Sequence, residues 1–204
     1  MTPREALKIG ALTMKLGEVR RATAHPDGQP ETDTTHTVML ALLVLRTLPQ
    51  HYDVGLALGF ALVHDLAEAY AGDTNTARGL TAEERAAKKV REELALERIR
   101  ADLPEIAEWI DRYEAMDTPE AAFVHILDKC CPKVCHALNL GRTLDALGMT
   151  PADVEAAHRK QGAELRVQHP DEHQAHKLFG ALSDAAERAI QPMPNRHPKE
   201  DCCP

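Results

Sequence analysis

The chain has 204 residues, a formal net charge of −8, and 44% hydrophobic but only 3% aromatic residues. This length suits one domain, and an apolar content carried by Ala, Leu and Val favours packed helices over strands. The acidic balance argues against a broad nucleic-acid interface but allows a small anionic substrate at a local cationic site. No uninterrupted apolar run reaches the roughly 18–20 residues of a membrane span, and no apolar signal core opens the chain, so we expect a cytoplasmic protein without a membrane partner.

The hydrophobic spacing predicts an all-α fold, with a single domain over residues 1–191 and a disordered, Pro-rich tail over 192–204. The second predicted helix takes Asp33 or Thr34 as its cap, the third takes Asp53, and Pro132 is expected to kink the sixth. A polar loop with two prolines and a glycine separates the first two helices. The helices are expected at about residues 3–22, 34–48, 54–72, 81–101, 104–113, 119–147, 151–167 and 171–190.

The five cysteines are an odd number, and their spacing does not match a zinc finger. Cys130, Cys131 and Cys135 crowd one helical segment, while Cys202 and Cys203 lie in the tail. We therefore expect reduced, packed thiols rather than a metal site.

Four candidate metal ligands stand in apolar surroundings: His36 at a helix start, the adjacent pair His64 and Asp65, and Asp128. An ionised carboxylate among Leu, Val and Ala costs several kcal/mol unless a counter-charge is present, and a divalent cation supplies one. This mixed nitrogen and oxygen donor set suits one Mn, Co, Fe, Ni or Zn ion, or Mg. Four protein ligands on an octahedral ion leave positions for water and a phosphate oxygen, which is an arrangement for metal-assisted hydrolysis.

A plainer interpretation competes at each position. A lone buried histidine is more often a core residue, and Asp128 alone could pair with a buried Lys or Arg. The His64-Asp65 doublet favours the metal site, because Glu68 follows four residues after His64, on the same face of a continuous helix. Glu68 is therefore the candidate for moving protons.

This pattern of His, then His-Asp, then a distant Asp resembles the HD superfamily, and within it the bacterial 5'-deoxynucleotidases and phage dATP triphosphohydrolases. The resemblance covers roughly residues 12–140. The matching segments are RATAHPDGQPETDTTH over 21–36, HDLAEAYAGD over 64–73 and HILD over 125–128.

The resemblance implies an HD-domain helical bundle that removes phosphate from nucleotides, most simply from deoxynucleoside monophosphates. It implies that Glu68 assists the attacking water or the leaving group, that Asp73 holds the sugar 3'-hydroxyl, and that Arg21 clamps the phosphate. From the sequence alone, Arg21 could equally be a solvent-exposed neighbour of Arg20. The implied metal ligands are His36, His64, Asp65 and Asp128.

Two departures from the family pattern leave the substrate open. Ala22 stands where the bacterial deoxynucleotidases are expected to carry Trp, so the base or sugar pocket has a different shape. The loop after Asp73 reads TNTAR without a proline, although Thr74 and Thr76 could offer hydroxyls to a phosphate. Triphosphate hydrolysis therefore remains an alternative.

Three other functions compete with this interpretation. A di-iron HD oxygenase needs further histidines before the last Asp, and the sequence between Asp65 and Val124 has none. A non-catalytic nucleotide-binding module could dispense with Glu68, which this chain retains. A ppGpp hydrolase is expected to carry further motifs that are absent here. The apolar first helix and the cysteine-bearing helix also favour a homo-oligomer, with a dimer or hexamer expected from the family.

Overall fold

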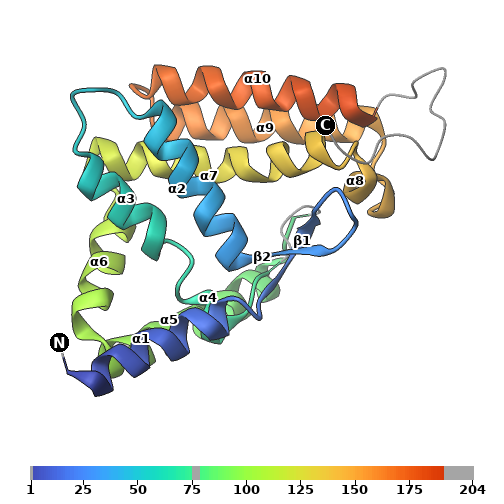
Figure 1. The fold of residues 1–204 in the computed structure, drawn as a ribbon. Helices are drawn as coiled ribbons and strands as arrows, with labels where there is room; N and C mark the ends of the chain where they lie inside the picture. Colours follow the sequence, from blue (N-terminus) through green and yellow to red (C-terminus); the bar gives the residue numbers. More distant parts are fainter. Residues whose placement is uncertain (1, 75–78, 191–204) are drawn as a thin grey trace. The chain divides into compact units, whose positions relative to one another are not determined.

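The computed structural model describes residues 2–74 and 79–190 (Figure 1). The chain forms two compact units: one contains the residues up to Arg21 together with Glu31–Val124, and the other contains Ala22–Pro30 and the residues from His125 onward. The described part of the chain is mostly helical, as predicted. Cys202, Cys203 and the tail predicted to be disordered lie outside the described residues.

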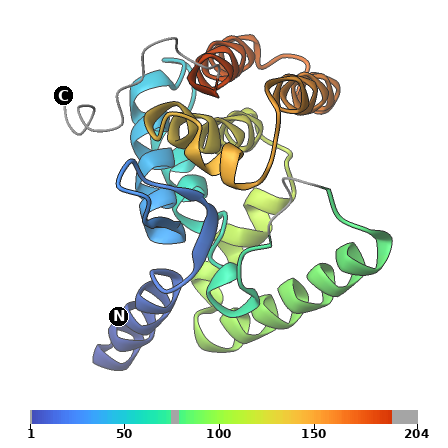
Figure 2. The ribbon, with the colours of Figure 1, turned by 90° about the vertical axis from the view of Figure 1, so that its right-hand side faces the viewer.

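The first unit is built mainly of helices. Helix α4 packs against both α1 and α5, and α3 packs against α2 and α6. The long α5 leads directly into α6 (Figure 2). The elements are α1 (Pro3–Leu16), α2 (Asp33–Thr47), α3 (Val54–Val63), α4 (Glu68–Ala71), α5 (Ala82–Asp102), α6 (Pro104–Glu114) and the first residues of α7 (Pro119–Leu138).

A two-stranded sheet replaces the end of the first predicted helix. Helix α1 stops at Leu16, and β1 (Arg20–Ala24) pairs with β2 (Pro30–Thr32). The turn between them contains Gly28 at φ +86°, a conformation that glycine adopts without steric cost. The expected helix over 3–22 is therefore six residues too long, and the polar loop contains a strand.

The predicted helix over 54–72 is also interrupted. Asp53 caps α3 as expected, because its side chain accepts a hydrogen bond from the Leu56 N–H. In a regular helix the Ala61 carbonyl would accept the N–H of Asp65, but here it lies 2.9 Å from His64 Nδ1. The chain tightens into three-residue turns before α4 begins at Glu68. The prediction that one continuous helix carries both His64 and Glu68 is therefore wrong.

The segment Val54–Ala71 passes a test of length and composition for a membrane-spanning helix, with a mean hydropathy of 1.3 and 39% of the segment buried. The sequence analysis expected no such segment. A core helix of a soluble protein passes the same test, and this segment carries His64, Asp65 and Glu68. The length and composition of this segment are therefore only weak evidence for a membrane span.

Close packing of α3 against α6 depends on a glycine. A Cβ atom placed on Gly59 would lie only 2.3 Å from Cζ3 of Trp109. We expect Gly59→Ala to lower the free energy of unfolding by about 1–3 kcal/mol, because the indole would have to shift within a packed core. Thermal or urea denaturation measures this change. The matched control is Gly10→Ala in α1, where the new methyl meets no atom within 4 Å and helix propensity favours alanine. Equal unfolding midpoints for Gly59→Ala and the wild type would contradict this account of the packing.

The second unit is also helical. Its elements are the later residues of α7, α8 (Arg142–Ala146), α9 (Pro151–Gln168) and α10 (His173–Ile190). Helices α9 and α10 lie side by side (Figures 1 and 2). The helix predicted over 119–147 breaks after Leu138, where Leu140 and Gly141 both have positive φ. Helix α7 continues through Pro132.

The cysteines of α7 are buried. Cys130, Cys131 and Cys135 are all buried, and burial raises the pKa of Cys130 to about 12. This confirms that the three side chains are packed. Apolar side chains are exposed on both helices of the oligomer prediction, with Leu7 and Met14 of α1 each 75% and Leu138 of α7 61% exposed, and the homo-oligomer stays a prediction.

Candidate metal centre

The first two turns of α2 bring His36 into the first unit's interior. Thr32 caps this helix by accepting a hydrogen bond from the Thr35 N–H at 3.1 Å, so neither predicted cap, Asp33 nor Thr34, is correct. Asp33 is instead the first helical residue. The His36 side chain is fully buried, and its Nδ1 lies 3.9 Å from the Glu31 carboxylate.

The tautomer of His64 follows from its hydrogen bond. A carbonyl oxygen only accepts, so Nδ1–H of His64 must donate to the Ala61 carbonyl at 2.9 Å. In the neutral imidazole the lone pair then lies on Nε2. A fixed Nδ1–H donor of this kind orients many metal-binding histidines.

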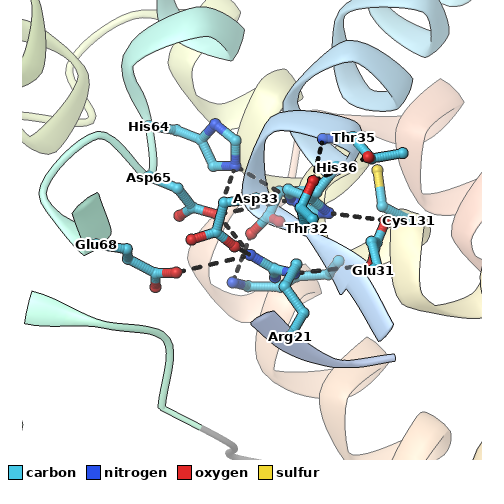
Figure 3. Close-up of polar contacts among 12 residues, drawn as sticks. Arg21, Glu31, Thr32, Asp33, Thr35, His36, His64, Asp65, Glu68 and Cys131 are labelled. Carbon is cyan, nitrogen blue, oxygen red and sulfur yellow. Dashed lines mark hydrogen bonds and ion pairs between the residues drawn. The ribbon is translucent and has the colours of Figure 1, made fainter. Parts of the chain in front are cut away.

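Three donor atoms of the first unit face one another (Figure 3). Nε2 of His36 and Nε2 of His64 are 3.2 Å apart, and Oδ2 of Asp65 lies 3.0 Å from the His64 nitrogen and 3.7 Å from the His36 nitrogen. Around an ion with ligand distances of about 2.1 Å, neighbouring donors are about 3.0–3.4 Å apart. Two imidazole lone pairs at this distance repel unless a proton or a cation lies between them. The trio therefore fits a divalent ion.

The fourth predicted ligand, Asp128, lies in the second unit on α7. Its side chain is 9% exposed, and Oδ2 is 2.6 Å from Nζ of Lys129. This contact is not the buried pair with Lys or Arg of the alternative interpretation, because Lys129 is 38% exposed. It does not exclude metal binding, since the Lys129 side chain can move into solvent.

Arg21 lies among acidic side chains and not on the open surface. Nη1 donates hydrogen bonds to Asp33 Oδ1 at 2.8 Å and to Asp65 Oδ2 at 2.9 Å (Figure 3). It also lies 3.7 Å from Oε2 of Glu68, and Nε lies 3.8 Å from Oε2 of Glu31. With 14% of its side chain exposed, Arg21 is not the solvent-exposed residue of the alternative interpretation.

The acidic side chains around Arg21 have perturbed protonation. Burial raises the pKa of Glu68 to about 10, and the charges of Asp65, Asp33 and Asp73 push it in the same direction, while Arg21 opposes them. Burial also raises the pKa of Asp33, against the stabilising effect of Arg21. Without a bound ion, Glu68 therefore keeps a proton at neutral pH.

The predicted substrate residues differ in burial and in the unit to which they belong. Asp73, in the first unit, is half-buried, and burial raises the pKa of its carboxyl group. Thr74 follows it and accepts a hydrogen bond from Arg91 Nη2 at 3.0 Å. Ala22 is exposed and belongs to the second unit, and Thr76 lies outside the described residues.

Two buried acidic residues near Arg21 were not assigned to the site from the sequence. Glu31 and Asp33 are both fully buried, and they precede His36 by five and three residues. A signal for them was present in the segment PETDTTH, because two acidic residues so close to a candidate ligand suggest a shared environment. The sequence pattern indicates Asp33 only as a helix cap.

Comparison with known proteins agrees with this geometry. A family model described as HD domain matches residues 13–169. The 5'-deoxynucleotidase HDDC2 of Bos taurus is 35% identical over 107 residues, covering 50% of this chain and 51% of that protein, and the Homo sapiens protein is 33% identical over the same shares. The chain thus spans about half the length of these relatives.

One solved structure matches over almost the whole length of both chains. The predicted metal-dependent phosphohydrolase from Magnetospirillum magnetotacticum MS-1 superposes with a TM-score of 0.68 at 25% sequence identity, covering 91% of this chain and 96% of that one. The family model spans 13–169, and His36, His64 and Asp65 bring their donor atoms together as the resemblance implied. The chain belongs to the HD domain family.

Proposed function

We propose that this protein is a metal-dependent phosphohydrolase that removes phosphate from 5'-deoxynucleotides. The observation that carries the proposal is the convergence of His36 Nε2, His64 Nε2 and Asp65 Oδ2 beside the partly buried Arg21. The names of the matched relatives support the substrate class, and they do so over half of this chain.

A divalent ion at these donors would supply Lewis acidity and lower the pKa of a bound water. Because His64 Nδ1–H is held by the Ala61 carbonyl, its Nε2 stays aimed at the ion without reorganisation. We assign Asp128 as the fourth ligand on the family pattern and on its burial in α7. This donor set takes Mn, Co, Fe, Ni or Zn more readily than Mg.

The remaining roles belong to residues around Arg21. Arg21 would neutralise the substrate phosphate with guanidinium donors, which match phosphate oxygens in geometry. Glu68 lies beside Arg21 and holds a proton when buried, so it can donate that proton to the leaving oxygen. Asp73 is proposed to bind the sugar hydroxyl on the family resemblance.

The test is product analysis with purified protein and a panel of ribo- and deoxynucleoside mono-, di- and triphosphates. We expect nucleoside and phosphate from deoxynucleoside monophosphates, loss of turnover after chelation, and recovery on adding Mn or Co. Nucleoside released from triphosphates alone would replace the monophosphatase by a triphosphohydrolase. Absence of turnover with every metal and nucleotide would overturn the proposal.

A further inference from the structure

Asp33 has a place in the site that neither the sequence pattern nor the family resemblance assigned to it. It is the first residue of α2, it is fully buried, and its Oδ1 accepts a hydrogen bond from Arg21 Nη1 at 2.8 Å (Figure 3). Arg21 comes from β1, so this contact joins the strand to the start of the helix that carries His36.

The second hydrogen bond of the same Arg21 nitrogen goes to an oxygen that the ion would also use. Oδ2 of Asp65 lies 2.9 Å from Arg21 Nη1 and 3.0 Å from His64 Nε2. A bound cation would draw on this oxygen's lone pairs and repel the guanidinium, which weakens the bond between Asp65 and Arg21. An ion held by His36, His64 and Asp65 does not draw on Asp33 in this way, although Asp33 also lies with Asp65 and Glu68 in a second acidic group that could hold a cation.

Two further carboxylates lie near Arg21. Oε2 of Glu68 is 3.7 Å from Nη1 and Oε2 of Glu31 is 3.8 Å from Nε, both longer than the 2.8 Å contact between Nη1 and Asp33. Asp33 is rigid in comparison, since Thr32 caps the helix at this point and the Asp33 N–H donates to the Val19 carbonyl at 3.3 Å.

We propose that Asp33 is a positioning residue that holds the Arg21 guanidinium in place for the substrate phosphate when the ion occupies Asp65. The inference rests on the proposed function, since it takes a phosphate group as the ligand. Holding Nη1 by Asp33 fixes the plane of the guanidinium, whose five N–H donors in a rigid fork match the oxygens of a phosphate.

Electrostatics alone predicts the opposite effect of removing Asp33. A carboxylate near a phosphate repels it, so loss of that charge would tighten anion binding. A positioning role predicts weaker binding, because Arg21 would lose its fixed orientation. The sign of the change therefore separates the two explanations.

The experiment is titration calorimetry of inorganic phosphate into the Mn-loaded protein, together with steady-state kinetics. The variants are Asp33→Asn, Asp33→Glu, Arg21→Ala and the double variant Asp33→Asn/Arg21→Ala. We expect Asp33→Asn to weaken phosphate binding about 5- to 10-fold, as loss of one charge-assisted hydrogen bond implies, and to raise KM more than it lowers kcat. Asp33→Glu should restore part of the affinity, and Asp33→Asn should not weaken binding further once Arg21 is absent.

Several results would overturn the inference. These are phosphate binding by Asp33→Asn that is unchanged or tighter, an equal loss in the Arg21→Ala background, or loss of bound Mn, which would make Asp33 a metal ligand. If Asp33→Asn does not fold, as judged by circular dichroism, Asp33→Ser carries the same test. Phosphate binding that depends on Asp33 in a protein that hydrolyses no nucleotide would defeat the proposed function and leave the inference standing.

Discussion

Replacing Asp65 by Asn is expected to abolish tight binding of the divalent ion and to lower kcat/KM by about 10³-fold or more. An amide oxygen has no formal charge and is a poorer ligand than a carboxylate, and the loss of Lewis acidity reaches the chemical step directly. Metal content after dialysis, measured by atomic emission, and nucleotide turnover report the two effects separately.

The matched control for this change is Asp111→Asn, which makes the same chemical substitution at a side chain that is 50% exposed and pairs with Arg100. It should leave metal content and turnover unchanged. An Asp65→Asn protein that keeps one equivalent of ion with wild-type affinity would show that Asp65 is not a ligand.

Replacing Glu68 by Gln is expected to lower kcat about 10²- to 10⁴-fold while the bound ion is retained, because glutamine keeps the shape but cannot transfer a proton. The buried position of Glu68 beside Arg21 supports this role. Turnover and metal content measured on the same preparation separate the loss of proton transfer from loss of the ion.

Glu108→Gln, at an exposed position on α6, is the control for that variant and should behave as the wild type. A Glu68→Gln enzyme with unchanged kcat would remove Glu68 from the chemistry. Loss of the ion together with activity would instead make Glu68 part of the metal centre.

The sequence predicted the helical class and three candidate metal ligands that converge in the first unit, because both leave strong local signals. Apolar residues at helical spacing predict the approximate bounds of α2 and α3. Buried polar residues such as His36 and Asp65 need partners wherever they lie in the fold. His36, His64 and Asp65 converge, so these polar side chains provide the partners that their burial requires.

The features that the sequence did not predict depend on contacts between distant residues or on single hydrogen bonds. The strand β1 pairs with β2 across a turn, and at the break after α3 the Nδ1 of His64 lies 2.9 Å from the Ala61 carbonyl. The role of Asp33 depends on Arg21, twelve residues earlier, folding back onto the start of α2. Hydrophobic periodicity in the sequence does not indicate which distant residues form such contacts.

The guanidinium of Arg21 also has a consequence for the metal-free protein. By donating to Asp33 and Asp65 it acts as a tethered counter-ion, so part of the negative charge at the centre is neutralised by the chain itself. We therefore expect the fold to survive chelation of the ion, unlike small domains that unfold when zinc is withdrawn, so that loss of the ion and loss of the fold are separate events.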